Sequence, residues 1–167
     1  NWFLINLQRH SDHHYKPDRR FPLLQNHGPD SAPQLPFGYS LSAGIAHTRW
    51  ATHGGVTQIN AHPHTDETGR IAVIHNGIIE NFARLRSELE ARGREFRSDT
   101  DTEVTAHLLA EEFAVTSDLA EAMRRVCRQL EGAFTLVAVH ADQPDVVVAA
   151  RRNSPLVVGR GEGENFL

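Results

Sequence analysis

The sequence Ala133-Phe-Thr-Leu-Val-Ala-Val139, followed after a short polar turn by Asp145-Val-Val-Val-Ala-Ala150, decides the fold class. Both runs are apolar and rich in β-branched residues, which predicts two strands. The turn around Asp142-Gln-Pro144 is too short for a crossover helix, so the strands are expected to pair as an antiparallel hairpin. This hairpin argues against a doubly wound parallel sheet.

From residue 44 onward, the other predicted strands and helices do not alternate strictly along the chain. We expect further strands at 44–50, 71–74 and 155–158, the second running into a turn at His75-Asn-Gly77. Apolar residues from Ile78 to Leu89 recur at helical spacing, with Gly93 as the stop. Thr100-Asp-Thr-Glu103 predicts a capping box that opens a second helix, and Ser117 is expected to cap a third. The predicted fold class is α+β, with helices packed on antiparallel sheets.

Composition excludes several functions. The chain has 167 residues, which suits one domain, and five of its eight prolines lie in the first 40 residues. We therefore expect residues 1–43 to be irregular. A net charge of −4 gives no reason to expect nucleic acid, and the sequence has no apolar run long enough to span a membrane. A single cysteine excludes an internal disulfide and favours a reducing cytoplasm.

Five of the 11 histidines fall between residues 47 and 75, at positions His47, His53, His62, His64 and His75. Imidazoles are common zinc ligands, but the spacings typical of zinc-binding helices are absent. From spacing alone, three readings stay open: structural hydrogen bonding, a metal-free active site, and a zinc hydrolase using His53, His62 and His64.

Other segments also allow two interpretations each. Arg49 followed by two glycines at 54–55 fits either a grip for an anionic substrate or a tight turn at a strand edge. Asn76-Gly77 fits an oxyanion hole or a simple turn. The carboxylates of 98–103 are accounted for by helix capping, although Asp101 could also meet a substrate ammonium. Cys127 falls on the apolar side of its helix, which predicts an inert thiol.

Taken together, the motifs resemble the glutaminase domain of glutamine–fructose-6-phosphate aminotransferases, which are class II glutamine amidotransferases. The resemblance covers residues 44–167. The segments that carry it are Gly44-Ile-Ala-His-Thr-Arg-Trp-Ala-Thr-His-Gly-Gly55, Asn60-Ala-His-Pro-His64, His75-Asn-Gly-Ile-Ile-Glu-Asn81, Ser98-Asp-Thr-Asp-Thr-Glu-Val104, Leu130-Glu-Gly-Ala-Phe134, Ala149-Ala-Arg151, Ser154-Pro-Leu-Val157 and Gly163-Glu-Asn-Phe166.

This resemblance implies an N-terminal-nucleophile hydrolase fold, with antiparallel sheets between helical layers, here incomplete. In that family an N-terminal cysteine attacks the glutamine amide, and the released ammonia passes to a sugar-isomerising domain. The roles that the resemblance implies, with no cofactor and no metal, are these: Arg49 and Asp101 for the glutamine α-carboxylate and α-ammonium, Asn76 and Gly77 for the oxyanion hole, Thr52 and His53 for the pocket, Trp50 for the ammonia path, and His62 and His75 as pocket-supporting residues.

The beginning of the chain departs from the family, because it starts with Asn1-Trp2-Phe3 and not with a cysteine. We therefore expect a fragment that does not itself hydrolyse glutamine. The partners implied are L-glutamine, fructose 6-phosphate through an isomerase domain outside this chain, and a second copy in a homodimer, with neither nucleic acid nor membrane. The alternative of another class is a non-catalytic module that binds or senses glutamine.

Overall fold

The computed structural model describes residues 45, 47, 54–160 and 165–167. They belong to two units, one formed by Ile45–Leu156 and one that includes Val157–Leu167. The first unit contains β1 (His64–Thr65), β2 (Ile71–Ile79), α2 (Phe82–Ala91), α3 (Thr102–Thr116), α4 (Leu119–Gln129), β3 (Gly132–His140) and β4 (Gln143–Arg152). The second contains a two-stranded antiparallel pair, β5 (Gly159–Arg160) and β6 (Asn165–Phe166).

The first unit is built on a four-stranded antiparallel sheet of order β1-β2-β3-β4. The longest ladder joins β2 to β3, with Ile71 opposite His140 and Ile79 opposite Gly132. The predicted hairpin is confirmed, since β3 and β4 pair directly. Its turn is even tighter than expected, because Gln143 already pairs with His140 and β4 therefore includes Pro144.

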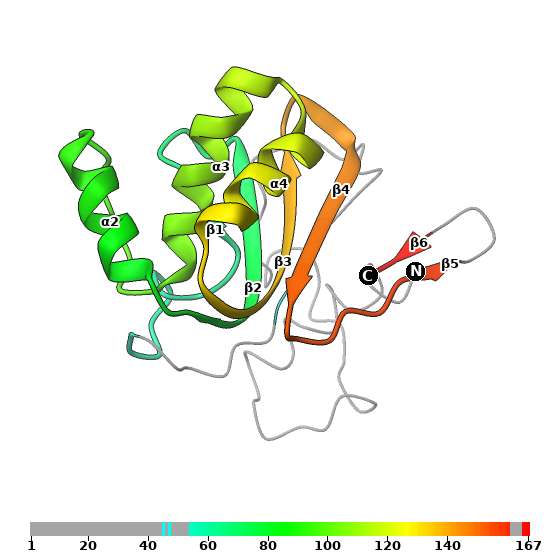
Figure 1. Cartoon of the computed structure of the whole chain (residues 1–167), viewed down its shortest axis with the longest axis horizontal. Helices are drawn as coiled ribbons and strands as arrows, with labels where there is room; N and C mark the ends of the chain where they lie inside the picture. The colour runs from blue at the N-terminus through cyan, green and yellow to red at the C-terminus, as the bar shows by residue number, and fades with distance from the viewer. Residues whose placement is uncertain (1–44, 46, 48–53, 161–164) are drawn as a thin grey trace, which may run out of the picture. The chain divides into compact units, whose positions relative to one another are not determined.

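Helices α3 and α4 cover one face of this sheet, and α2 lies on the far side of α3 (Figure 1). Helix α3 packs on β1 and β2, α4 packs on β4, and α2 packs against α3. The strands contribute core residues at alternate positions, because successive side chains point to opposite faces of the sheet and one face packs against the helices. The core consists mainly of Ile71, Val73 and Ile79 from β2, Phe134, Leu136 and Ala138 from β3, and Leu85, Leu89, Val104, Leu108, Leu109, Leu119, Met123 and Val126 from the helices. The α+β class with an antiparallel sheet is confirmed.

Strand β2 runs further than its sequence suggested. The predicted turn at His75-Asn-Gly77 is wrong, because Asn76 pairs with Thr135 and Gly77 with Phe134 in the ladder. The helix predicted from Ile78 begins only at Phe82. The predicted stop is confirmed: Gly93 has φ +86, and the N–H groups of Gly93 and Arg94 donate to the carbonyls of Glu90 and Leu89 in a Schellman motif.

Both predicted helix starts need correction. Residue Asp101, not Thr100, precedes α3, and no side chain caps it; Glu103 reaches back instead to the N–H groups of Arg97 and Ser98. Asp118 caps α4 by accepting from the N–H groups of Ala120 and Glu121. Ser117, the expected cap, is the left-handed residue that ends α3.

Two predicted strands have other outcomes. Of the segment 44–50, only Ile45 and His47 are described, and neither lies in a strand. Residues 155–158 are not in a strand either, and the pairing begins at Gly159. Within the described part of the chain, no helix is long and apolar enough to cross a membrane.

Candidate functional site

The candidate site begins with Asn76 and Gly77, which with Ile78 form an exposed segment near the end of β2, between buried His75 and buried Ile79. Gly77 has φ +122, a backbone conformation that favours glycine. A Cβ atom at this position would lie 2.1 Å from the carbonyl oxygen of Ala133. The backbones of β2 and β3 therefore lie so close together here that only glycine fits at position 77.

His47 determines which group Asn76 can offer to a ligand. The Nε2 atom of His47 lies 3.0 Å from the Asn76 side-chain oxygen Oδ1. An amide oxygen can only accept, so His47 must carry its proton on Nε2 and donate. Because Oδ1 is occupied in this way, Asn76 presents its Nδ2 group, which only donates. A neutral donor at this position is what an oxyanion hole requires.

Asp101, the N-cap of α3, and Thr102, its first residue, hold strand β2 on either side of Asn76 and Gly77. The Thr102 hydroxyl lies 3.0 Å from His75 Nδ1, and the Asp101 oxygen Oδ2 accepts from the N–H of Ile79 at 2.9 Å. The other oxygen of Asp101 lies 3.8 Å from His75 Nδ1. Residues Asp101, Thr102 and His75 are all buried. The exposed segment is thus held between two buried contacts.

The glycine turn at 54–55 is held to the segment before α3 by a buried asparagine. The Asn60 amide donates to the Gly55 carbonyl at 3.1 Å and to the Asp99 carboxylate at 3.3 Å, and its oxygen accepts from the Asp99 N–H at 3.0 Å. Gly54 has φ +76, and a Cβ there would lie 2.8 Å from the Asn60 amide nitrogen. Asn60 therefore joins the turn that follows His53 to the residues that precede Asp101.

Glu103 organises the start of α3 from inside the protein. Its carboxylate accepts from the N–H groups of Arg97 and Ser98 and from the Ser98 hydroxyl, and it lies 3.8 Å from His107 Nε2. Burial alone would raise the pKa of this carboxyl, but the neighbouring His107 and the Ser98 and Arg97 hydrogen bonds outweigh burial and lower it to about 2. Glu103 is therefore ionised and structural.

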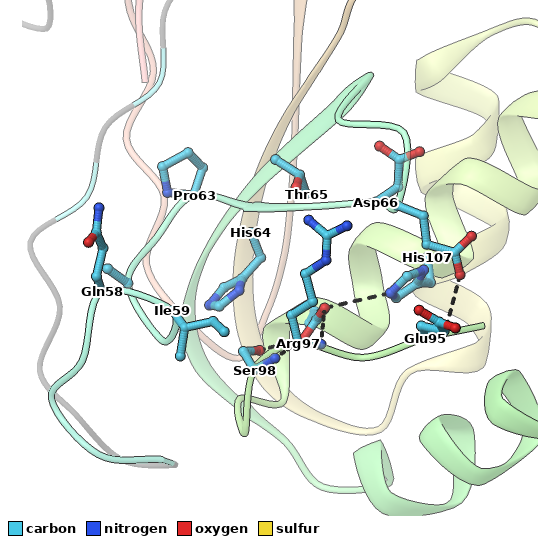
Figure 2. Close-up of a pocket in the computed structure, with 13 residues that line it drawn as sticks. Gln58, Ile59, Pro63, His64, Thr65, Asp66, Glu95, Arg97, Ser98 and His107 are labelled. Atoms are coloured by element: carbon cyan, nitrogen blue, oxygen red, sulfur yellow. Dashed lines mark hydrogen bonds and ion pairs between the residues drawn. The ribbon is translucent and has the colours of Figure 1, made fainter. Parts of the chain in front are cut away.

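A pocket of about 130 Å³ lies beside this carboxylate. Figure 2 shows His64, Ser98 and His107 around it, contributed by β1, the segment before α3, and α3 itself. Among the described residues, neither Asn76, Gly77 nor Asp101 lines this pocket. Its two buried carboxylates, Asp66 and Glu103, are already engaged by backbone N–H groups. The described part of this pocket therefore lies beside Asn76, Gly77 and Asp101 and does not include them.

The predicted site residues fall into two groups. Asn76, Gly77, Asp101, His62 and His75 come together around the end of β2 and the start of α3. The remaining predicted residues, Arg49, Trp50, Thr52 and His53, lie outside the described residues. The sequence reasoning assigned no role to three residues of the assembled site, which are His47, Asn60 and Thr102.

The histidines are engaged by hydroxyl groups. The Nε2 atoms of His62 and His64 lie 3.0 Å from the hydroxyl oxygens of Thr102 and Thr100. Their rings also contact each other, with centroids 4.9 Å apart. Among the described residues, no three His, Cys, Asp or Glu side chains are placed to hold a metal ion. This arrangement favours structural hydrogen bonding over a zinc site for His62 and His64.

Cys127 has the environment of a structural thiol. It packs against the helix–sheet core in α4, and burial raises its pKa despite the nearby Arg152. A raised pKa leaves less thiolate at neutral pH. Arg152 donates to the carbonyls of Cys127 and Leu130, which fixes the end of α4 on β4. The thiol is therefore unsuited to act as a nucleophile.

Comparison with known sequences defines the class. A family model described as a glutamine amidotransferase domain matches residues 47–167, and the chain belongs to this family. Curated relatives include the glutamine–fructose-6-phosphate aminotransferases (isomerizing) of Streptomyces coelicolor, 75% identical over 128 residues, and of Leifsonia xyli, 67% identical over 124 residues. These matches cover 77% and 74% of this chain and 21% and 20% of the relatives. The chain thus spans about a fifth of their length.

A solved structure is also similar. It is a glutamine phosphoribosylpyrophosphate amidotransferase from B. subtilis, complexed with ADP and GMP, with 28% identity and a TM-score of 0.47. The match covers 57% of this chain and 20% of that one.

Proposed function

We propose that this chain is the glutamine-hydrolysing, ammonia-donating part of a glutamine–fructose-6-phosphate aminotransferase, the enzyme that makes glucosamine 6-phosphate. The observation that carries the proposal is the 75% identity over 128 residues to a relative of that name. The site geometry supports it, because Asp101 and the strand that bears Asn76 and Gly77 are joined by a buried hydrogen bond. The Asp101 carboxylate and the neutral donors of Asn76 and Gly77 thus lie in the same part of the site.

The two ends of glutamine need different partners. The α-ammonium needs an anion, and we assign it to Asp101, whose carboxylate has lone pairs beyond the one that accepts from Ile79. The α-carboxylate suits the planar fork of an arginine, and we assign it to Arg49. Thr52 and His53 would line the pocket between them, Trp50 would lie on the ammonia path, and His62 and His75 would support the pocket.

The side-chain amide is where the chemistry occurs. Attack of a thiolate on its carbonyl carbon moves negative charge to the oxygen, and neutral N–H donors stabilise that charge. We assign this role to Asn76 Nδ2, which the contact with His47 leaves as the donor, and to the N–H of Gly77. Collapse of the adduct would release ammonia and leave a thioester for hydrolysis. The nucleophile that the resemblance implies is an N-terminal cysteine, a role that half-buried Cys127 in α4, with its raised pKa, does not fit.

The remaining parts of the proposal concern the whole enzyme. Fructose 6-phosphate would bind in a sugar-isomerising domain, which would receive the ammonia. The family resemblance supports a homodimer, and the single cysteine supports a cytoplasmic location. No cofactor or metal is required by the groups assigned above.

Titration calorimetry of the folded 167-residue chain with L-glutamine tests the binding step. We expect heat with L-glutamine and none with D-glutamine, which presents its α-ammonium and α-carboxylate with the opposite hand. The isosteric change Asp101→Asn should weaken binding at least tenfold, since it removes the charge that faces the ammonium.

Asp142→Asn is the matched control. Asp142 is an exposed carboxylate paired with Arg70, beyond the end of the β2–β3 ladder opposite to Gly77. This variant should bind glutamine as tightly as the unaltered chain. A folded chain that gives no heat at millimolar L-glutamine would refute the proposed function.

A further inference from the structure

The Thr102 hydroxyl lies between two imidazoles. Its oxygen is 3.0 Å from His62 Nε2 and 3.0 Å from His75 Nδ1. Thr102 is the first residue of α3 and is 1% exposed, so its hydroxyl is shielded from solvent. The three side chains come from separate segments: the loop before β1, strand β2 and helix α3.

A single hydroxyl proton constrains both rings. Thr102 can donate to one imidazole nitrogen only, and it must accept from the other if both contacts are hydrogen bonds. Of the two facing nitrogens, at least one therefore carries a proton, and where the hydroxyl donates to one ring the other ring must donate to it. The tautomers of His62 and His75 are thus coupled through Thr102.

Asp101 decides the direction of this coupling. Its Oδ1 atom lies 3.8 Å from His75 Nδ1, and both side chains are buried. A carboxylate favours an N–H on the nitrogen that it faces. His75 Nδ1 therefore donates to Thr102, which leaves the Thr102 proton available to donate to an unprotonated His62 Nε2. Both rings then carry their proton on Nδ1.

The consequence reaches the exposed part of β2. His75 directly precedes Asn76, and its ring faces the helices, because it shares the face of Ile71 and Val73. The ring centroids of His62 and His47 are also 4.4 Å apart, and His47 Nε2 contacts Asn76. Thr102 is therefore linked to Asn76 both along the strand and through the two rings.

We propose that Thr102 is a positioning residue whose hydroxyl holds His62 and His75 in their Nδ1–H tautomers and so orients Asn76 and Gly77 toward the glutamine amide. The part concerning glutamine rests on the proposed function. The part concerning the tautomers does not, and it can be measured without ligand.

The test compares Thr102→Val, which keeps the shape but removes the hydroxyl, with Thr102→Ser, which keeps the hydroxyl. Nitrogen-15 NMR of the imidazoles distinguishes the two tautomers in the full chain. We expect Nδ1–H signals for His62 and His75 in the unaltered chain and in Thr102→Ser. In Thr102→Val, His62 should return to the Nε2–H form that predominates in free histidine.

Glutamine affinity supplies the second readout. Thr102→Val should bind L-glutamine about tenfold more weakly, as expected for a lost buried hydrogen bond, and Thr102→Ser should bind within about twofold of the unaltered chain. The proposal is overturned if His62 carries Nε2–H in the unaltered chain, or if Thr102→Val changes neither the tautomers nor the affinity. If the unaltered chain binds no glutamine, the proposed function fails, while the imidazole spectra still decide the coupling.

Discussion

The imidazole of His47 donates from Nε2 to the side-chain oxygen of Asn76, across 3.0 Å and 29 positions of sequence. This contact fixes the orientation of an amide that could otherwise rotate by half a turn and exchange its donor for its acceptor. The amide nitrogen of Asn76 is then the group available to a ligand. Replacing His47 should therefore let the Asn76 amide rotate and lose its fixed orientation.

Changing His47 to phenylalanine should weaken glutamine binding about tenfold, because the amide of Asn76 loses the donor that orients it. His47→Gln is the informative partner variant, since a glutamine amide nitrogen can donate from a similar position. Calorimetry should show that it retains most of the affinity. Equal losses in both variants would contradict the role given to the Nε2 proton.

Alanine at Gly77 should destabilise the protein by at least about 3 kcal/mol, since a Cβ there meets the backbone of β3 in a conformation that only glycine adopts readily. Gly93→Ala is the matched control. Gly93 also has a positive φ, but nothing lies within 4 Å of its Cβ position, so about 1 kcal/mol is expected. Urea unfolding followed by circular dichroism measures both, and similar costs would contradict the close approach.

Replacing Asn60 with aspartate should cost more stability than replacing it with alanine. The aspartate would place a negative charge where the amide now donates to the Asp99 carboxylate and the Gly55 carbonyl, whereas alanine only leaves polar groups unpaired, for about 2 kcal/mol. Thermal unfolding at neutral pH compares the two. The exposed neighbour Gln58, changed to alanine, should have almost no effect, and an aspartate variant as stable as the unaltered chain would refute the contact.

The low pKa of Glu103 predicts acid sensitivity. With a folded pKa of about 2, against 4.5 for the free side chain, the unfolded chain takes up this proton first as the pH falls. The stabilisation is complete above about pH 5 and is lost as the pH falls toward 2, and it amounts to roughly 2–3 kcal/mol. Unfolding free energies of Glu103→Gln should show a shallower pH dependence in that window, whereas exposed Glu80→Gln should keep the original slope.

The Cys127 thiol should react slowly. Because burial raises its pKa, little thiolate forms at neutral pH, and alkylation by iodoacetamide should be slow in the folded chain and fast after unfolding in urea. Cys127→Ala should bind glutamine as the unaltered chain does. Rapid alkylation that glutamine blocks would place this cysteine at the site and contradict the structure.

Much of this fold follows from short-range patterns. The hairpin of β3 and β4 and the apolar faces of the helices are visible as periodicity in the sequence. The helix starts were misplaced because the decisive contacts are long-range or three-dimensional: Glu103 matches a capping box in spacing, but it bonds to the chain before the helix. Asn-Gly at 76–77 matches a turn, yet pairing with β3 extends the strand through it.

The same distinction applies to the site. Asn76, Gly77 and Asp101 could be named in advance because the resemblance carries them as motifs. Asn60 and Thr102 could not, since an asparagine or a threonine in a polar segment has no distinguishing local signal. The assembled structure shows that each joins segments about 40 positions apart. His47 stood out only as one member of a histidine-rich stretch.

The presence of Asn76 and Gly77 inside the β2–β3 ladder has a consequence for amide hydrogen exchange. A loop can open and close without disturbing the protein around it, whereas these donors are lost only when the longest ladder of the sheet separates. A ligand bound to them therefore opposes that separation directly. Glutamine should slow exchange most at amides of β2 and β3 that are far from the ligand itself, such as those paired near Val73 and Ala138.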